Sequence, residues 1–334
     1  MKTHLAAAAV LFSLLGCACT PQLPASGQAQ GSRKDRPVAA MQVVEPPADL
    51  GKSAYGHVAN LVSFGPRDVG SVGWQRGLDY MAAELQRLGF EPRRDRWKDA
   101  AEGIEFENVS VVIPGSRRER IVIGCHHDTK RTHGHDEEAH NFEFVGANDS
   151  ASGVGLLLAL APVLATRRNE ATIEIVFFDG EESLDWDWNE AKRALFGSKR
   201  FVREHRASEV RGEKGPIAAF VLLDMVGRSD IQVDEETNST KELRELLWSA
   251  AVACGVQDRF FAKAWPVSDD HLPFLEAGIP SLDIIDLHSN PHWHKPTDTL
   301  DHISADSLHM IGRVVLTLLP AVEARYLPPR KAIR

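Results

Sequence analysis

From about residue 50 the sequence alternates apolar, strand-like runs with segments that carry apolar residues at helical spacing. This alternation restricts the fold more than any other feature, because strands separated by helices join into a mainly parallel sheet that helices cover on both faces. We therefore expect one α/β domain over residues 50–328, with a mainly parallel central sheet flanked by helices. The predicted helices cover 74–90, 149–165, 191–205, 239–253, 270–277 and 304–324, and the predicted strands cover 107–116, 119–128, 172–178, 217–226, 258–265 and 280–286.

The first twenty residues, MKTHLAAAAVLFSLLGCACT, have a basic start, a short apolar run and small residues, which is typical of a secretory signal. The stretch LLGC, ending at Cys17, resembles the lipobox of bacterial lipoproteins, in which the cysteine is lipidated and becomes the first mature residue. That resemblance implies a signal peptide over 1–16 and a lipid anchor. Because Ala18 follows the cysteine instead of an aspartate, it also implies an outer-membrane destination, facing the periplasm or the cell surface. The alternative is ordinary cleavage nearby, which would leave a soluble periplasmic or secreted protein.

Residues 17–48 are predicted to be a flexible tether, because the stretch from 20 onward is rich in Pro, Gln, Ala, Gly and Ser and cannot bury a core. The net charge of the whole chain is -9, and no block of Lys and Arg stands out. We therefore expect no nucleic-acid partner, since such binding needs a concentrated basic surface. Within the fold, Cys125 and Cys254 could form a disulfide, although two separate buried thiols are the commoner arrangement.

Acidic residues and histidines follow several of the predicted strands. In sheets of this kind, ligands bind beyond the carboxyl ends of the strands. Taken singly, each of these residues has an ordinary alternative role as a helix cap, a strand-end acid or a surface histidine. Together they would form a cluster of like charges, which is costly unless a cation compensates it. Imidazole and carboxylate donors without thiolate suit a catalytic zinc or a similar metal. The residues concerned are His126 of CHHD, Asp149 of GANDSASG, Glu181 and Glu182 of DGEE, Asp224 of LLDMVG and His294 of HWHKPTDT.

The adjacent pair Glu181 and Glu182 leaves the predicted strand 172–178. Successive residues leaving a strand point in different directions, so the two carboxylates can serve two tasks. One can hold a cation while the other moves a proton. The alternative is that the pair simply begins a loop.

These motifs, in this order, resemble the M28 family of zinc aminopeptidases and the related animal-type glutaminyl cyclases, over nearly all of 55–325 beginning with SFGPRDVGS. The resemblance implies their fold, and it implies Glu181 as general acid/base. In the aminopeptidases two zinc ions would be held by five residues, with Asp149 as the bridging ligand. In the cyclases one zinc ion is held. The two-metal set falls on His126, Asp149, Glu182, Asp224 and His294, and the one-metal set on Asp149, Glu182 and His294.

Finer features resemble the cyclase branch: SDDHLPFLEAGIP, a tryptophan (Trp293) directly before the metal histidine, and a tryptophan-bearing loop after the glutamates. The resemblance implies that Trp293 and either Trp186 or Trp188 wall the substrate pocket. Two departures exist, since the buried histidine of the cyclases falls at Asp283 here, and the cysteine that pairs with the position of Cys125 falls near Val154.

The resemblance implies an enzyme that acts on peptide or protein N-termini. We expect a glutaminyl-peptide cyclotransferase that converts N-terminal glutamine to pyroglutamate and releases ammonia, with Asp269 steering the transferred proton and Asp224 an acid near its path. Asp283, in place of the buried histidine of the cyclases, would weaken the hydrogen-bond chain through Asp269, and Asp298 would orient His294. The first alternative is a two-zinc aminopeptidase, and the second is a catalytically silent surface lipoprotein that binds a partner. His288 is expected on the surface, and Trp265 in ordinary packing.

Overall fold

The computed structural model describes residues 36–188 and 192–329. Among these residues, six strands form one sheet in the order β1-β2-β4-β3-β5-β8. The strands β4, β3, β5 and β8 run parallel, whereas β1 and β2 form an antiparallel edge. The prediction of a mainly parallel sheet is confirmed. The strand bounds are β1 Arg93–Lys98, β2 Glu105–Ile113, β3 Arg120–His126, β4 Thr172–Phe178, β5 Ile217–Asp224 and β8 Ser281–Ile285.

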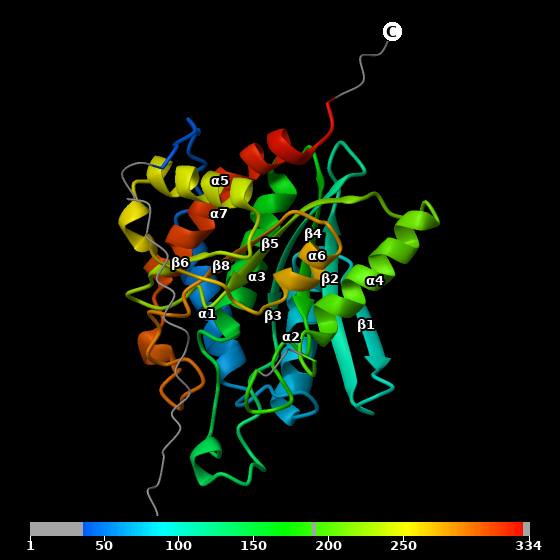
Figure 1. Ribbon diagram of the computed structural model, residues 1–334, viewed down its shortest axis with the longest axis vertical. Helices are drawn as coiled ribbons and strands as arrows, with labels where there is room; N and C mark the ends of the chain where they lie inside the picture. The colour runs from blue at the N-terminus through cyan, green and yellow to red at the C-terminus, as the bar shows by residue number, and fades with distance from the viewer. Residues whose placement is uncertain (1–35, 189–191, 330–334) are drawn as a thin grey trace, which may run out of the picture.

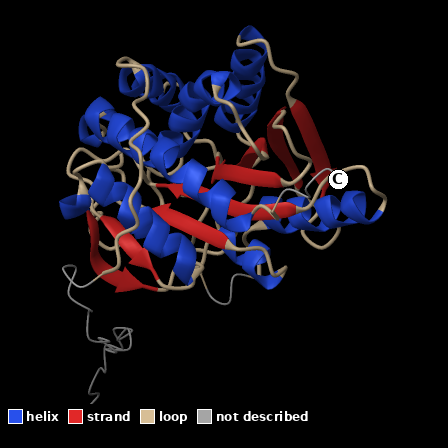
Figure 2. Cartoon of the chain, turned by 90° about the horizontal axis from the view of Figure 1, so that it is seen from above, coloured by secondary structure: helices blue, strands red, loops and turns tan. Residues whose placement is uncertain are grey.

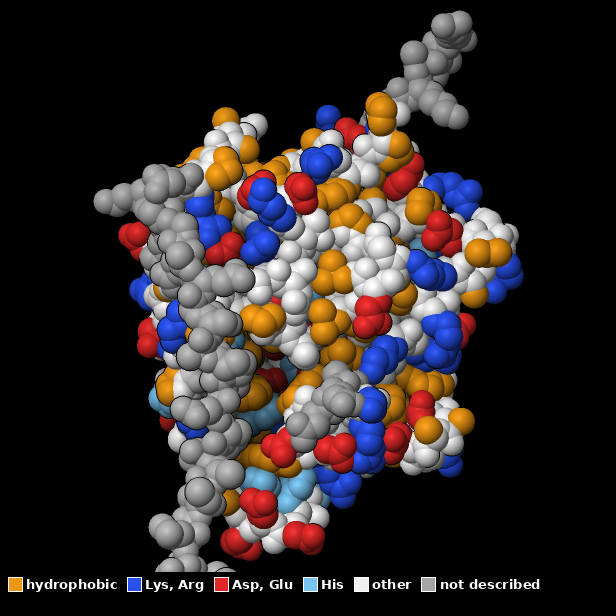
Figure 3. Space-filling model, in the orientation of Figure 1, with side chains coloured by type: hydrophobic (Ala, Val, Ile, Leu, Met, Phe, Trp, Pro, Cys, Tyr) orange, Lys and Arg blue, Asp and Glu red, His pale blue; other side chains and the backbone are white. Residues whose placement is uncertain are grey.

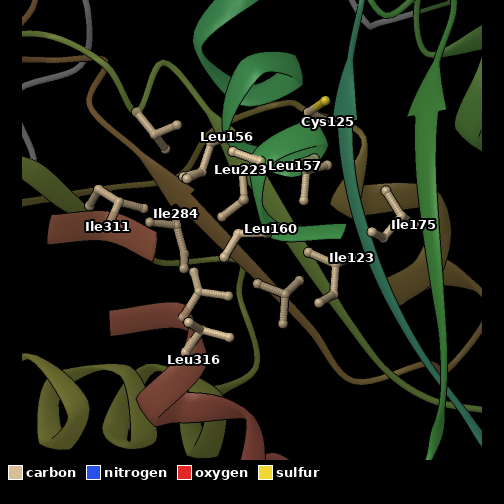
Figure 4. Close-up of a cluster of buried hydrophobic side chains, with 14 of the residues drawn as sticks. Ile123, Cys125, Leu156, Leu157, Leu160, Ile175, Leu223, Ile284, Ile311 and Leu316 are labelled. Atoms are coloured by element: carbon tan, nitrogen blue, oxygen red, sulfur yellow. The ribbon is translucent and has the colours of Figure 1, made fainter. Parts of the chain in front are cut away.

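Helices cover both faces of the sheet, as Figures 1 and 2 show. On one face lie α1 Leu50–Val62, α2 Val72–Arg87, α3 Ala151–Thr166, α5 Lys241–Ala253 and α7 Ala305–Tyr326; on the other lie α4 Phe196–Val210 and α6 His271–Glu276. The strands alternate accordingly: Ile121 and Ile123 point into the larger core with α3 and α7, and Val122 points toward α4 and α6. Figure 4 shows the larger core, where Leu156, Leu157 and Leu160 of α3 and residues of α7 pack on the sheet.

Smaller elements complete the described part of the chain. A second, two-stranded sheet pairs β6 Val233–Glu236 with β7 Phe260–Trp265. Short 3-10 turns form η2 Glu138–His140, η3 Gln257–Arg259 and η4 Leu300–His302.

Three elements were not predicted: α1, β1 and β6. Strand β1 has the sequence RRDRWK, which lacks the apolar alternation of a half-buried strand. Its arginines Arg94 and Arg96 instead form ion pairs with Glu107 of β2, whose side chain is buried. Helix α4 starts at Phe196 rather than at the predicted residue 191, which lies outside the described residues.

The N-terminal segment differs from the prediction in its second half. Residues 1–35, with the predicted signal peptide and Cys17, lie outside the described residues. Residues 36–48 are an extended strap rather than a tether: the backbone N–H groups of Ala39 and Val44 donate to Ser249 Oγ of α5 (3.0 Å) and Thr317 Oγ1 of α7 (3.1 Å). The folded part thus begins about a dozen residues earlier than the sequence indicated.

Two sequence features are explained by burial. Helix α7 is long and apolar enough to cross a membrane, yet 61% of its most apolar window is buried against the rest of the protein. Cys125 and Cys254 are free and buried, so the expectation of two separate thiols is confirmed.

Candidate metal centre and active site

The predicted site residues meet at the carboxyl ends of the parallel strands. His126 is the last residue of β3, Asp224 is the last residue of β5, and Glu181 and Glu182 follow the end of β4 by three and four residues. His294 lies in the loop between β8 and α7, and Asp149 lies two residues before α3. The fold therefore brings together side chains that are up to 168 positions apart in the sequence.

Two groups of metal-donor atoms lie in the described part of the chain, and Asp149 belongs to both. In the first, His294 Nε2 lies 3.0 Å from Glu182 Oε1 and 3.5 Å from Asp149 Oδ2. In the second, His126 Nε2 lies 3.1 Å from Asp149 Oδ1 and 3.2 Å from Asp224 Oδ1. The donors of each group lie within 4.8 Å of one another, which is close enough to surround one ion.

The donor set fits a metal ion on chemical grounds. His126 Nδ1 and Glu182 Oε2 are buried and have no hydrogen-bond partner among the described residues. Burial lowers the pKa of His126, but Glu181, Asp128, Asp149 and Asp224 outweigh it and hold that pKa well above its usual value. The cluster therefore attracts positive charge, and a divalent cation on imidazole and carboxylate donors would supply it.

Glu181 stands beside these groups in a different environment. Burial raises its pKa well above the usual range for a carboxyl, and the neighbouring Glu182 and Asp269 raise it further. Its Oε2 lies 3.7 Å from His126 Nδ1. The carboxyl of Glu181 is therefore buried, belongs to neither donor group and is easily protonated. Such a carboxyl is suited to general acid/base chemistry.

The loop that carries both glutamates is held in place by the side chain of Asp128. Its carboxylate oxygens accept hydrogen bonds from the backbone N–H groups of Glu181 (3.3 Å) and Glu182 (3.2 Å). Sequence reasoning did not assign this role to Asp128, although its place in CHHD directly after β3 was a usable signal.

A second unassigned residue is Lys130, whose side chain is almost fully buried. Its Nζ donates to the carbonyl oxygens of Ser183 (2.8 Å) and Asp185 (2.7 Å) and lies 3.9 Å from Glu182 Oε2. Lys130 thus fixes the start of the tryptophan-bearing loop and places a positive charge near the carboxylate of Glu182.

Asp298 has a role other than the predicted one. Its carboxylate accepts the backbone N–H groups of Asn148 (2.8 Å) and Asp149 (3.1 Å), whereas His294 contacts Glu182 and Asp149. Asp298 therefore positions the metal-site loop before α3 instead of orienting His294. Burial, together with the charge of Asp149, raises the pKa of Asp298 to about 7.

All the metal donors except His126 line a cleft of about 340 Å³, and we call the part of the cleft that they form its floor. Trp188 and Trp293 both line it, as does Asp269, whose pKa is raised well above the usual range by burial and by Asp224. The remaining lining residues are Asp149, Glu181, Glu182, Asp224, Met225, Pro266, Val267, Ser268, Ile285, Leu287, His288 and His294. His288, expected on the surface, is thus part of the cleft.

The two loop tryptophans lie in different surroundings, although the ring centroid of Trp186 is also only 6.5 Å from that of His294. Trp188 lines the cleft, whereas Trp186 stacks on His140 of η2, with ring centroids 3.7 Å apart and planes 9° apart. Figure 3 shows histidine side chains gathered at the lower end of the molecule, where the loop carrying η2 lies. Trp186 therefore joins this loop to the active-site loop.

Asp283 lies behind the cleft in a buried acidic cluster. Its Oδ2 is 3.8 Å from His271 Nδ1, and His271 Nε2 is 3.2 Å from Glu236 Oε2. Burial raises the pKa of Asp283 well above the usual range, and Asp269 raises it further. The pair Asp269 and Asp283 is therefore electrostatically linked.

Comparison with known proteins agrees with this geometry. The sequence profile of peptidase family M28 matches residues 108–319. The chain belongs to peptidase family M28. This M28 chain is 27% identical to a glutaminyl-peptide cyclotransferase of Drosophila melanogaster over 293 residues, 78% of this chain and 79% of that protein.

Solved structures superpose on most of the chain. A glutaminyl cyclase from an Acidobacteriales bacterium superposes with a TM-score of 0.73 at 30% identity, covering 86% of this chain and 99% of that one. A protein described as a leucine aminopeptidase precursor, from Bacteroides thetaiotaomicron, superposes with a TM-score of 0.72 at 28% identity, covering 84% and 99%. M28 members are metal-dependent, in keeping with the two donor groups.

Proposed function

We propose that this protein is a glutaminyl-peptide cyclotransferase, which converts an N-terminal glutamine to pyroglutamate and releases ammonia. The observation that carries the proposal is the cleft: Glu181 stands beside a complete donor group at the floor, and Trp188 and Trp293 form its walls. Relatives that span most of the chain and carry the name glutaminyl cyclase support it.

We propose zinc as the metal, held by Asp149, Glu182 and His294. Imidazole and carboxylate donors, with no thiolate in the group, suit a catalytic zinc. When bound, the ion supplies Lewis-acid polarisation of the side-chain carbonyl of the substrate glutamine.

Glu181 moves the proton of the reaction. The substrate α-amine attacks the side-chain carbonyl carbon, a new C–N bond closes the five-membered ring, and the bond to the side-chain nitrogen breaks. Glu181 takes the proton from the attacking amine and gives it to the departing ammonia, so it returns to its initial state. Its raised pKa brings it closer to that of an α-amine, which favours transfer in both directions.

The cleft walls keep water from the reacting carbonyl. Trp188 and Trp293, with Met225, Val267 and Ile285, provide apolar surface above the carboxylates. Exclusion of water matters because hydrolysis of the same amide would yield glutamate instead of pyroglutamate. Asp269, at the side of the cleft, steers the amide and the transferred proton.

A second candidate function is an aminopeptidase, and the second donor group favours it. His126, Asp149 and Asp224 could hold a further ion beside the first, and two-metal sites activate a water for hydrolysis. Under this candidate Glu181 is the base that takes a proton from that water.

Two peptides distinguish the candidates. The zinc-loaded protein is incubated with a peptide beginning in Gln and a matched peptide beginning in Leu, and the products are weighed by mass spectrometry. Loss of one ammonia from the Gln peptide alone, abolished by a chelator and restored by zinc, is expected. Release of free leucine would assign the aminopeptidase. No change in either peptide, with zinc bound, would leave the third candidate, a surface lipoprotein that only binds a partner.

We also propose that the protein is exported and lipid-anchored through Cys17. The apolar leader and the stretch LLGC support this. Expression of the full chain and of Cys17→Ser tests it by membrane fractionation: the unchanged chain is expected with the outer membrane and the variant in the soluble fraction. Equal distribution of the two would contradict the anchor.

A further inference from the structure

The mouth of the cleft carries aromatic surface that the chemistry at its floor does not use. Among the described residues, the exposed large hydrophobic side chains are four valines and two tryptophans, Trp265 (37% exposed) and Trp293 (39%). Trp293 lines the cleft, and Trp265 directly precedes the lining residues Pro266, Val267 and Ser268. Trp293 is thus part of the cleft itself, and Trp265 adjoins the cleft through the neighbouring Pro266.

Trp265 is held in place by a stacked partner. Its ring lies parallel to that of His288, with centroids 4.6 Å apart and planes 11° apart, and His288 lines the cleft. His288 is fixed in turn: its backbone N–H and its Nδ1 lie 2.8 and 3.2 Å from Asp234 Oδ2, and its carbonyl accepts a hydrogen bond from Lys263 Nζ. The buried carboxylate of Asp234 also accepts the N–H of Leu287.

This construction differs from ordinary packing. A tryptophan that only completes a core is buried, whereas Trp265 keeps more than a third of its surface exposed while its position is set by a fixed imidazole. A rigid, partly exposed aromatic surface at a binding site is suited to stacking with a planar side chain. The substrate chain must pass here, because its first residue reacts at the floor and its continuation leaves through the mouth.

We propose that Trp265, stacked on His288, forms a subsite for the second residue of the substrate and that this subsite selects an aromatic side chain. The inference rests on the proposed cyclase function and adds the preferred substrate class, peptides that begin with Gln followed by Phe, Tyr or Trp. Trp265 acts here as a specificity-determining residue and takes no part in the proton transfer.

The test measures a ratio. Cyclisation of Gln-Phe-Ala and of Gln-Ala-Ala is compared through kcat/KM for the unchanged protein, Trp265→Ala and Trp265→Phe. Because an aromatic pair gains about 0.5–1.5 kcal/mol, the unchanged protein is expected to prefer the Phe peptide by about 2- to 10-fold, mainly through KM. The preference should fall to about one in Trp265→Ala and largely return in Trp265→Phe. A general loss of folding or of metal lowers kcat/KM for both peptides alike and leaves their ratio unchanged.

The control is Trp97→Ala. Trp97 lies on the edge strand β1, stacked on Phe106 with centroids 5.6 Å apart, so this variant removes an equal side chain away from the cleft. It should keep the preference of the unchanged protein. An unaltered ratio in Trp265→Ala would overturn the subsite while the cyclase function stands. If neither peptide yields pyroglutamate, the cyclase function fails and the subsite falls with it.

Discussion

Two adjacent glutamates face different groups, and this difference assigns their roles. Glu182 Oε1 lies 3.0 Å from His294 Nε2 within a complete donor group, whereas Glu181 belongs to neither group. Asp128 accepts both backbone N–H groups, so one anchor fixes the backbone that carries both glutamates. One position therefore serves the metal and its neighbour serves the proton.

The first prediction separates these two roles. Glu181→Gln should bind the metal as the unchanged protein does but lose about 10²- to 10⁴-fold in kcat, because the amide cannot take the amine proton. Glu182→Gln is the matched variant and should lose metal content as well as turnover. The measurement is the metal-to-protein ratio after dialysis, together with kcat. Loss of metal in Glu181→Gln would show that the two carboxylates are not divided in this way.

The second prediction concerns Asp298, which acts on the site through the backbone. Asp298→Asn replaces one carboxylate oxygen with an NH₂ group, which cannot accept an N–H, so either Asn148 or Asp149 loses its partner. Because groups that orient a metal ligand typically contribute 10- to 100-fold to affinity, metal affinity should fall by about that factor with little change in overall stability. Competition with a metal-binding dye measures it, and unchanged affinity would contradict the role.

At the residue scale, the metal donors were predictable because each lies at a strand end and the strands alternate with helices. The residues that support the metal donors were harder to predict. Asp128, Lys130 and Asp298 all act by contacts with backbone groups of another loop, and such contacts depend on how the loops close. Trp186 and Trp188 were equally hard to tell apart, because they lie two positions apart on one loop. Trp188 lines the cleft, whereas Trp186 contacts another loop.

At the scale of elements, a buried ion pair joins the last helix to the sheet. Glu323 of α7, with 6% of its side chain exposed, pairs with Arg167 at the end of α3 and accepts the backbone N–H groups of Glu170 and Ala171 just before β4. The side chain of Glu323 therefore connects α7, the end of α3 and the start of β4. This contact lies at the end of the sheet opposite the metal site.

The third prediction follows from this contact. Glu323→Ala leaves two backbone N–H groups without their acceptor and removes the carboxylate from Arg167, whose guanidinium keeps only Asn169 Oδ1. The free energy of unfolding should therefore fall by about 3 kcal/mol. Glu323→Gln keeps one acceptor oxygen and should lose clearly less. Urea unfolding followed by circular dichroism measures both variants. Equal losses in the two would indicate that the negative charge paired with Arg167, and not the retained acceptor oxygen or the side-chain volume, is what matters at this position.

Elements with apolar periodicity were predicted well, and charged ones were not. Strands β3, β4, β5 and β8 are mostly apolar because both of their faces are buried. Strand β1 is stabilised by arginine side chains that reach Glu107, so its sequence lacks the expected alternation. Helix α1 does carry apolar residues at helical spacing, from Leu50 to Leu61, and was simply not recognised.

At the scale of the whole molecule, the order of strands and helices was enough to predict one α/β domain with a site at the carboxyl ends of its strands. The depth and walls of the cleft were not predictable, because they come from loops whose course depends on contacts between distant residues. The start of the domain was also misjudged, because a segment rich in Pro and Ala can still pack when its backbone finds partners. Val44, for example, bonds to Thr317, which is 273 positions away.

The fourth prediction concerns this strap, residues 36–48. Hydrogen bonds attach the strap to Ser249 of α5 and Thr317 of α7, and Glu45 of the strap pairs with Arg313 of α7. The apolar residues of the strap, Met41, Val43 and Val44, pack on the core. With about 1 kcal/mol for each of the two partly buried hydrogen bonds, removal of the strap should lower Tm by about 5 °C.

The comparison uses protein 36–334 and protein 49–334, with the double variant Ser249→Ala, Thr317→Val in the longer protein as the matched control. That variant keeps the strap but removes both hydrogen-bond acceptors, so it should show part of the loss. Cyclase activity at 25 °C should be equal in all three proteins, because these contacts lie on helices behind the sheet and not at the cleft. If 49–334 melts at the same temperature as 36–334, the strap adds nothing to the fold and the tether extends to residue 48 after all.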